Sequence, residues 1–275
     1  MIISAISDIH SPENRGQLNQ AIARMQDSDV IIIAGDISSN PKQYQRVLKK
    51  FRGLKARKLA VLGNHDLYVQ KGKDSFQKAR LLERICKEQD FHLLDTSPLI
   101  HQGTAFVGNM GWYDYTFAPR IKSEPFQVLG RGSRTLDTMT DEDFAVKCFS
   151  FNGTPVSWAD RYHIHTQFSD KEILEHTAHK LQADIKAVEE KADKIVYVTH
   201  HVPIPQFVYD GDILWKVFNA YQGSPELGKV AFSSPKLRAV ICGHSHIKGY
   251  TKIKDVECFD VSREFGDLEA TDIKI

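Results

Sequence analysis

The chain has 275 residues, of which 41% are hydrophobic and 26% charged, and its formal net charge at pH 7 is +1. This length allows one large α/β domain or two small ones, each with a buried core. The balanced charge argues against the strongly basic surface of a nucleic-acid-binding protein, and no apolar stretch approaches the roughly 20 residues of a membrane-spanning helix.

Apolar runs alternate with amphipathic segments near the start of the chain. The sequence predicts strands at 2–6, 30–34 and 58–62, separated by helices at about 13–26 and 42–51. Continuous apolar runs, such as the second of these strands, are typical of strands that are buried on both faces. This rhythm predicts βαβ units in a mainly parallel sheet.

The pattern changes after a further helix, which is predicted at about 74–88. Short β-rich segments at 92–94, 99–101 and 104–108 are separated by turn residues and predict hairpin-like strands. Residues from about 109 to 165 are aromatic and loop-like. A loop of that length is uncommon in a compact domain unless it is a lid or an insertion.

Regular periodicity returns in the last third of the chain. Apolar residues recur every three or four positions between 173 and 192, which predicts a helix, and a strand follows at 195–198. A second insertion at about 203–228 is rich in Pro, Gly and aromatic residues. It precedes a strand at 237–242, and the last residues, including 256–261, alternate in the manner of antiparallel strands.

Two features of the sequence bear on the compartment. The opening residues lack the basic region of a signal peptide. The cysteines are widely scattered and form no CxxC pair; they are Cys86, Cys148, Cys242 and Cys258. A disulfide framework is therefore not expected, and the default expectation is a cytoplasmic protein.

Five short islands of polar residues follow predicted strands. They are Asp8-Ile9-His10, Gly35-Asp36, Gly63-Asn64-His65-Asp66, His200-His201 and Gly243-His244-Ser245-His246. Ligands in open α/β sheets gather beyond the carboxyl ends of the strands, so these side chains should converge if their strands share a sheet. Asp8 and His10 are two positions apart and could point to the same side, as could His244 and His246.

The residue types in these islands predict a site for two metal ions. Carboxylate, imidazole and amide ligands without thiolate suit Mn, Fe, Zn or Mg rather than a structural zinc. Two ions roughly 3.5–4 Å apart need a bridging carboxylate, and they clamp both oxygens of an in-line displacement. Any one island is weak evidence, because Asp-x-His at a strand end is usually a satisfied polar pair. The prediction depends on all five in order.

The ordered set of islands resembles the motifs of the calcineurin-like metallophosphoesterase family, over residues 8–246. The resemblance implies a four-layer α/β/β/α sandwich of two mixed sheets flanked by helices, with an inserted cap region. It also implies a single metallophosphoesterase domain over residues 1–275, with cap-like insertions at about 109–165 and 203–228.

The resemblance also implies a role for each motif residue. One metal would be held by Asp8, His10 and His246, the other by Asn64, His200 and His244, and Asp36 would bridge them. His65, oriented by Asp66, would stabilise the developing charge or protonate the leaving oxygen, and a metal-bridging hydroxide would be the nucleophile. His200 is preferred over His201 because the family ligand is the first residue after the strand.

The expected function is the metal-dependent hydrolysis of a small phosphate ester, either a monoester or a diester. Trp112, Tyr113 and His201 are candidates for contact with the substrate, and the aromatic insertions suggest an organic group, such as a nucleobase, near the phosphorus. The alternative is that these aromatic residues form the insertion's own small core. Arg131, Arg134 and Arg161 are further candidates to bind the phosphate.

Two alternative functions remain open. A nuclease acting on DNA or RNA would use the same chemistry, although the balanced charge counts against it. A non-catalytic scaffold of the same fold should lack some ligands or His65, and this chain keeps them. His163 and His165 share the spacing of true ligands but lie in the first insertion, so we interpret them as loop or surface groups. The oligomeric state is left open.

Overall fold

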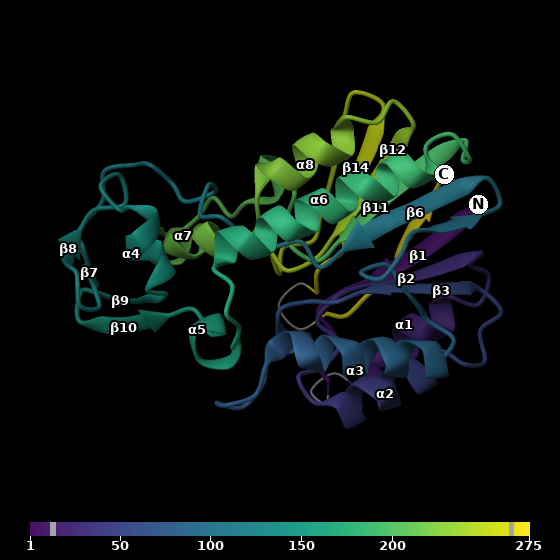
Figure 1. The fold of residues 1–275 in the computed structure, drawn as a ribbon, viewed down its shortest axis with the longest axis horizontal. Coiled ribbons are helices and arrows are strands. Elements are labelled where there is room, and N and C mark those ends of the chain that lie inside the picture. The colour runs from purple at the N-terminus through teal and green to yellow at the C-terminus, as the bar shows by residue number, and fades with distance from the viewer. Residues whose placement is uncertain (12–14, 264–266) are drawn as a thin grey trace.

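The computed structural model describes residues 1–11, 15–263 and 267–275. The first of its two large sheets contains the amino-terminal strand (Figure 1). The strands of this sheet are β1 (Ile2–Ile6), β2 (Val30–Ala34), β3 (Arg57–Val61), β4 (His92–Leu93) and β15 (Thr271–Lys274). Their order is β15-β1-β2-β3-β4, with β1 to β4 parallel and β15 antiparallel at the edge. Helices α1 (Arg15–Arg24), α2 (Pro41–Lys49) and α3 (Ser75–Glu88) cover its outer face (Figure 1).

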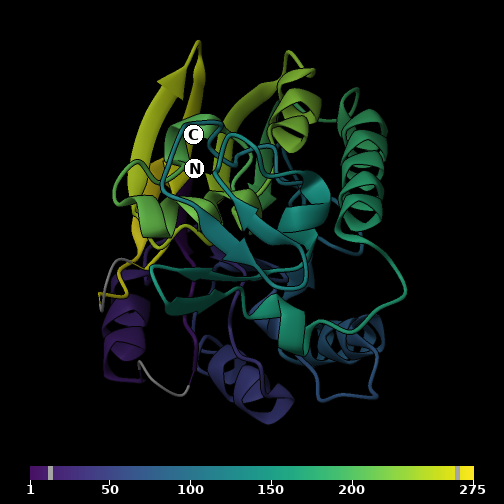
Figure 2. The same ribbon diagram turned by 90° about the vertical axis from the view of Figure 1, so that its left-hand side faces the viewer.

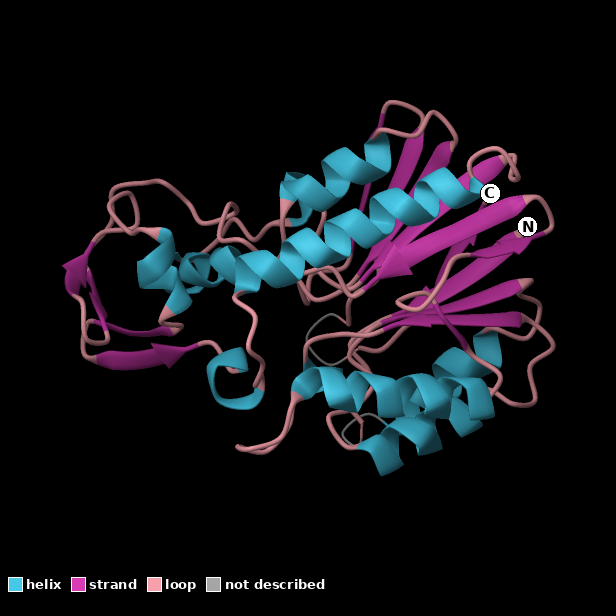
Figure 3. Ribbon diagram, viewed as in Figure 1, coloured by secondary structure: helices cyan, strands magenta, loops and turns pink. Residues whose placement is uncertain are grey.

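The second sheet packs against the first. Its strands are β5 (Leu99–His101), β6 (Thr104–Asn109), β11 (Lys194–Thr199), β12 (Leu237–Cys242), β13 (Gly249–Ile253) and β14 (Val256–Asp260). In the order β13-β14-β12-β11-β6-β5, the inner strands are parallel and the two edge strands antiparallel. Helices α6 (Asp170–Val188) and α8 (Pro225–Phe232) cover its outer face. The four-layer sandwich of two mixed sheets is therefore confirmed (Figure 3).

Alternate residues of each strand belong to two different cores. In β2, Ile32 packs in the core between the sheets, whereas Ile31 and Ile33 pack against the helices. All three side chains are fully buried. Successive side chains of a strand point to opposite faces, so a strand covered on both sides must be apolar throughout. This is why the predicted strands appeared as continuous apolar runs.

Most predicted elements of the sandwich lie within a few residues of the observed ones. The first two residues of the helix predicted at about 13–26 lie outside the described residues, and α1 is observed from Arg15. The predicted hairpin of β5 and β6 is antiparallel as expected. The last strands were only partly predicted, because β14 pairs antiparallel with β13 but parallel with β12.

The first insertion is more regular than the sequence indicated. It contains a small antiparallel sheet in the order β10-β9-β7-β8, together with two short helices. The elements are β7 (Phe126–Val128), β8 (Gly132–Arg134), α4 (Asp141–Ala145), β9 (Cys148–Phe151), β10 (Thr154–Ser157) and α5 (Asp160–His163). The prediction of a loop-like segment was wrong because strands of three or four residues are too short to show a period. We call this part the small sheet.

The second insertion consists of short helical turns. They are η2 (Pro205–Phe207), α7 (Ile213–Lys216) and η3 (Val217–Tyr221), and α8 begins before the predicted end of the insertion. The small sheet projects from one end of the sandwich, with α7 beside it, while both termini lie toward the other end (Figure 1). Viewed from that projecting end, it lies in front of the sandwich (Figure 2). None of the described helices combines the length and apolar character needed to cross a membrane.

Candidate metal centre

The seven predicted metal ligands lie together at the end of the sandwich where β1, β2, β3, β11 and β12 finish. In each loop the first ligand stands one to three residues beyond its strand. We call these residues the strand-end cluster: Asp8, His10, Asp36, Asn64, His200, His244 and His246. Hydrogen bonds join its two halves across the sheets, for example from the His244 N–H to Asp8 Oδ2 at 3.1 Å. The cluster thus lies over the seam between the sheets.

Most of the cluster has an unusual backbone conformation. Asp8, His10, Asp36, His244 and His246 have φ values between 44° and 74°, in the left-handed region. A non-glycine residue in a sparsely populated region costs on the order of 1–3 kcal/mol and persists only when its surroundings impose it. Such strain concentrates at functional sites, because the turn has to point successive side chains toward one ligand.

Two glycines make room for the cluster. A Cβ on Gly63 would lie 2.1 Å from Asp36 Oδ1, so only glycine lets this loop pass so close to the carboxylate. Gly35 has a φ of +90°, and a Cβ there would lie 2.5 Å from His200 Nδ1. The glycines of the Gly-Asp and Gly-Asn-His-Asp islands therefore serve close packing around the ligands.

Asp36 occupies the centre of the cluster. Its Oδ1 lies 3.4 Å from His200 Nε2, and its Oδ2 lies 3.6 Å from His10 Nε2. The carboxylate is almost completely buried. It takes part in two of the groups of side chains that could hold a metal ion, one with His10 and His65 and one with His200 and His244. This is the position that a bridging carboxylate would occupy.

Two polar atoms around Asp8 lack partners among the described residues. Asp8 Oδ1 and His10 Nε2 are buried, have no hydrogen-bond partner there and lie 3.7 Å apart. His246 Nε2 is also 3.7 Å from Asp8 Oδ1. Buried unsatisfied polar atoms are rare because each costs about 1–3 kcal/mol. These two atoms and the more exposed His246 Nε2 surround one point and fit a divalent ion, and the nitrogen and oxygen donors suit Mn, Fe, Zn or Mg.

Backbone carbonyls fix the tautomers of the two histidines in the other half of the cluster. His200 Nδ1 lies 2.8 Å from the Ala34 carbonyl, and His244 Nε2 lies 3.1 Å from the Tyr221 carbonyl. A carbonyl can only accept, so each of these nitrogens carries a proton. The remaining nitrogens, His200 Nε2 and His244 Nδ1, lie 3.1 Å apart, with Asn64 Oδ1 3.2 Å from His200 Nε2. Two nitrogens and an amide oxygen fit a second metal ion.

Around Asp36 the electrostatics of the cluster favour positive charge. Burial alone would raise the pKa of Asp36, but attraction to His200 and His65 outweighs it and holds this pKa well below its usual value. Burial lowers the pKa of His200, yet the charges of Asp36 and Asp8 outweigh that effect and raise it to about 10. The negative potential of the two carboxylates, which holds a proton on His200, would equally attract a divalent cation.

His65 stands beside the ligands and faces the solvent. Its side chain is 36% exposed, and its Nε2 lies 3.9 Å from Asp36 Oδ2. Burial is the main cause that lowers its pKa below the usual value. The ring stacks on Tyr68 at 4.3 Å between centroids and meets His10 edge-on at 4.6 Å. Tyr68, rather than a carboxylate, therefore sets the plane of the His65 ring.

The predicted role of Asp66 in orienting His65 requires a correction. Among the described residues, the Asp66 carboxylate accepts hydrogen bonds from the backbone N–H of Ser38 at 2.8 Å and of Gly63 at 3.0 Å, not from the His65 imidazole. Burial is the first cause that raises the pKa of Asp66, to about 7. Asp66 thus ties together the loops that carry Asp36 and Asn64. Sequence adjacency misled here, because the turn at His65 sends neighbouring side chains in different directions.

A cavity of about 390 Å³ opens beside the cluster. Its polar end is lined by Asp36, His65, His244, Ser245 and His246, and its other walls by Trp158, Tyr209, Trp215, Phe218, Asn219 and Gln222. The aromatic walls come from both insertions. Neither Lys nor Arg occurs among these lining residues. The cavity thus joins the metal ligands to a largely aromatic space, which is the usual form of a site for a small organic ligand.

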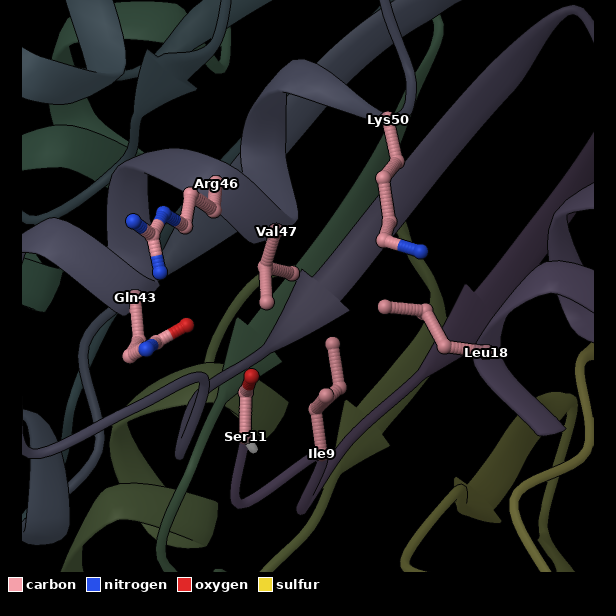
Figure 4. Close-up of a pocket in the computed structure, with 7 residues that line it drawn as sticks. All are labelled: Ile9, Ser11, Leu18, Gln43, Arg46, Val47 and Lys50. Carbon is pink, nitrogen blue, oxygen red and sulfur yellow. The ribbon is translucent and has the colours of Figure 1, made fainter. Parts of the chain in front are cut away.

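A second hollow, of about 310 Å³, is lined by Ile9, Ser11 and side chains of α1 and α2 (Figure 4). Val47 and Ile9 face its centre, and the polar groups of Arg46 and Lys50 stand at opposite sides. No residue of the strand-end cluster lines it. Of these two hollows, only the first is lined by predicted ligands, namely Asp36, His244 and His246.

The predicted substrate contacts require a correction. Trp112, Tyr113 and His201 are fully buried, and none of them lines the cavity. The Trp112 and Tyr113 rings stack on each other at 5.0 Å, and His201 Nδ1 donates to the Met110 carbonyl at 2.9 Å. Of the two readings of the aromatic motif, the structure therefore supports an internal core beneath the cavity.

The three candidate arginines are engaged elsewhere. Arg131 and Arg134 pair with Asp143, and Arg161 donates to the Val146 carbonyl. These contacts are internal to the first insertion.

Several residues of the site carried no signal in the sequence. Trp158, Trp215 and Phe218 lie in segments whose aromatic content was noted, but nothing separated the residues that line a cavity from those that fill a core. Asp160 was also missed. It is 1% exposed and accepts a hydrogen bond from Asn64 Nδ2 at 2.8 Å. A lone Asp at a short helix is common, so only the folded arrangement reveals it.

Comparisons with known proteins identify the family and support the fold. A family model described as calcineurin-like phosphoesterase matches residues 1–248. The solved structure of phosphopantetheinyl hydrolase from Mycobacterium tuberculosis is similar, with a TM-score of 0.73, 18% identity, and coverage of 98% of this chain and 95% of that one. A dimetal phosphatase from Danio rerio is similar with a TM-score of 0.50 and 13% identity, over 94% and 86% of the chains. A search of curated proteins found no match.

Proposed function

Because the chain belongs to the calcineurin-like phosphoesterase family, we propose that it hydrolyses phosphate esters of small organic molecules with the help of two divalent metal ions. The observation that carries this proposal is the position of Asp36. One oxygen of its buried carboxylate faces His200 and the other faces His10, so a single side chain joins both halves of the strand-end cluster. A scaffold that had lost catalysis would have no need to maintain this arrangement.

Each half of the cluster would hold one ion. Asp8, His10 and His246 would hold the first, and Asn64, His200 and His244 the second, with Asp36 shared between them. When bound, two such ions lower the pKa of a water molecule and neutralise charge on the phosphate oxygens. The hydrogen bonds from His200 and His244 to backbone carbonyls keep their free nitrogens turned toward the ions.

His65 would act on the substrate rather than on the metals. Burial lowers its pKa, so the ring is neutral near pH 7 and can donate one N–H to a substrate oxygen. It lines the cavity, and its stacking on Tyr68 holds the ring in place. We propose that it stabilises the charge that develops on the phosphate or on the leaving oxygen.

The organic part of the substrate would occupy the aromatic side of the cavity. Trp158, Trp215 and Phe218 offer ring faces, and Trp215 is 58% exposed. These rings suit an apolar or planar group such as a nucleobase. The similar phosphopantetheinyl hydrolase adds a phosphopantetheinyl ester to the candidates, although 18% identity carries only the fold.

The insertions at about 109–165 and 203–228 would then roof the site as a cap on a single metallophosphoesterase domain over residues 1–275. A nuclease remains the alternative. The absence of Lys and Arg from the described lining of the cavity favours a small ester over a nucleic acid. We place the protein in the cytoplasm as a proposal that rests on its sequence.

The test begins with metal analysis of the purified protein and with hydrolysis of aryl phosphate monoesters and diesters in Mn²⁺, Fe²⁺, Zn²⁺ and Mg²⁺. About two metal equivalents and metal-stimulated hydrolysis are expected. A protein that binds no metal, and whose hydrolysis no metal stimulates, would contradict the proposal. A panel of nucleotides, a phosphopantetheinyl ester and single-stranded DNA would then separate small esters from nucleic acid.

A further inference from the structure

Asp160 is a buried carboxylate of the first insertion that accepts four hydrogen bonds. Its Oδ1 accepts from Asn64 Nδ2 and from the Tyr68 hydroxyl, each at 2.8 Å. Its Oδ2 accepts from the Tyr113 hydroxyl at 2.8 Å and from Trp158 Nε1 at 2.9 Å. A carboxylate that receives two donors on each oxygen is fully satisfied, which offsets the cost of burying its charge.

One of these bonds fixes the orientation of a predicted metal ligand. The amide of Asn64 has an oxygen end and an NH₂ end, and only the oxygen can bind a metal. A carboxylate accepts but does not donate, so the end of Asn64 that faces Asp160 must be the NH₂ group. The oxygen is therefore turned to the opposite side, where it lies 3.2 Å from His200 Nε2.

The other bonds reach two further parts of the site. Tyr68 forms the stacking platform of His65, and Trp158 lines the aromatic side of the cavity. Asp160 follows the last strand of the small sheet by only three residues, at the start of α5. A single side chain of the insertion therefore contacts a metal ligand, the support of His65 and a cavity wall.

We propose that Asp160 is a positioning residue of the metal centre, through which the docked first insertion holds Asn64 in its metal-binding orientation. This inference rests on the proposed dinuclear site, but not on any particular substrate. Hydrogen-bond partners of metal ligands typically contribute 10–100-fold to metal affinity. Metal affinity in this protein should accordingly depend on a residue of the insertion that is not itself one of the predicted ligands.

The chain offers a matched control in Asp170. Its carboxylate accepts from Trp112 Nε1 at 2.9 Å, from Lys147 Nζ at 2.8 Å and from the Tyr115 hydroxyl. Asp170 thus also holds the first insertion through an indole N–H and a tyrosine hydroxyl, with a lysine ammonium in place of the Asn64 amide. Within the described residues, no hydrogen bond or ion pair joins Asp170 to the strand-end cluster. Asp160→Asn and Asp170→Asn should both weaken the attachment of the insertion, whereas only Asp160→Asn should loosen Asn64.

The experiment is a Mn²⁺ titration of metal-free protein, monitored by calorimetry. The electron paramagnetic resonance spectrum of the loaded protein is then recorded. Wild type and Asp170→Asn should bind two ions and give the spectrum of an exchange-coupled pair. Asp160→Asn should bind the second ion about 10–100-fold more weakly. After addition of two equivalents of Mn²⁺, it should show the spectrum of isolated ions. In an Asn64→Ala background, Asp160→Asn should cost no further affinity, because it acts through Asn64.

The outcomes separate this inference from the proposed function. Absence of Mn²⁺ binding by wild type would contradict the proposed dinuclear site itself. Equal affinity in wild type and Asp160→Asn, or an equal loss in Asp160→Asn and Asp170→Asn, would overturn the positioning role and leave the dinuclear site standing. If Asp160→Asn does not fold, as judged by circular dichroism, Asp160→Glu takes its place in the same titration and in the same cycle.

Discussion

The strand-end cluster and the first insertion solve the problem of buried polar groups in opposite ways. In the insertion, the Asp143 carboxylate accepts a hydrogen bond from the backbone N–H of Thr140 and forms an ion pair with Arg131. Its charge is therefore satisfied by groups of the insertion itself. In the cluster, Asp8 Oδ1 and His10 Nε2 are buried without partners in the described part of the chain, on a backbone with positive φ. The insertion is arranged for its own stability, whereas the cluster holds unsatisfied donor atoms ready for a ligand.

The difference also shows which part carries chemistry and which part selects. Every predicted ligand belongs to a sandwich loop, and the walls of the cavity that do not belong to these loops come from the two insertions. Asp160 is where the two regions meet. Substitutions in the cluster should therefore alter metal binding and turnover, and substitutions in the insertions, apart from Asp160, should alter mainly substrate affinity.

The largest effect is expected for Asp36→Asn. The substitution keeps the size of the side chain and the oxygen that accepts from the backbone N–H of His65. It removes the negative charge shared between the two halves of the cluster. We expect the bound metal to fall from two equivalents to one or fewer and kcat/KM to fall by about a thousandfold. Metal analysis and steady-state kinetics measure both. Full metal content with near-normal turnover would show that Asp36 is not the bridge.

His65→Ala should have the next largest effect and should separate the catalytic group from the ligands. The His65 side chain lines the cavity but is not assigned to either metal. We expect two metal equivalents to remain and kcat to fall by roughly a hundredfold, since the lost group interacts with the transition state. An unchanged rate would remove His65 from the mechanism, and a loss of metal would move it into the ligand set.

The same contrast explains how much could be predicted from the sequence. The sandwich, and the convergence of the predicted ligands at one end of it, were predictable because the central strands are continuous apolar runs and each motif begins within a few residues of a strand end. The walls of the cavity were not, since they combine side chains far apart in the chain, such as Trp158 and Trp215.

Burial was the other limit on prediction from sequence. The motif at Trp112 and Tyr113 looked suited to contact substrate, yet these rings face the interior. An aromatic residue in a loop can fill a core or line a pocket, and only the packing around it decides. The role of Asp66 was missed for a similar reason, because one of its two partners, Ser38, comes from another loop.

Substitution of two tryptophans tests which aromatic residues meet the substrate. Trp215 is 58% exposed at the cavity, so Trp215→Ala should raise KM by about tenfold with little change in kcat, because an aromatic contact contributes about 1 kcal/mol beyond the area it buries. Trp112→Phe removes the partly buried hydrogen bond to Asp170 and should lower the free energy of unfolding by about 1 kcal/mol. Its KM should not change. The opposite pattern of KM values would restore Trp112 as a substrate contact.

The smallest effect concerns Asp95, which joins the two sheets behind the strand-end cluster. Its carboxylate accepts from the N–H of Leu62 at 2.9 Å and of Met110 at 2.7 Å, and burial is the main cause that raises its pKa from 3.8 to about 6. The folded protein therefore holds this proton more tightly than the unfolded chain. The stability that results is fully present below about pH 4 and is lost as the pH rises through about 6.

Asp95→Asn should remove this pH dependence. The free energy of unfolding of the variant, relative to that of wild type, should increase as the pH rises from about 4 to 7. Replacing a carboxylate oxygen by an amide NH₂ also changes the stability by a constant amount, which does not affect this pH dependence. Urea unfolding of metal-free protein at several pH values measures the difference and excludes metal binding as its cause. Parallel pH curves for the two proteins would show that Asp95 titrates alike in the folded and unfolded states. The Asp95 carboxylate between the two sheets would then resemble Asp143 in the insertion, as a buried charge that its hydrogen bonds fully satisfy.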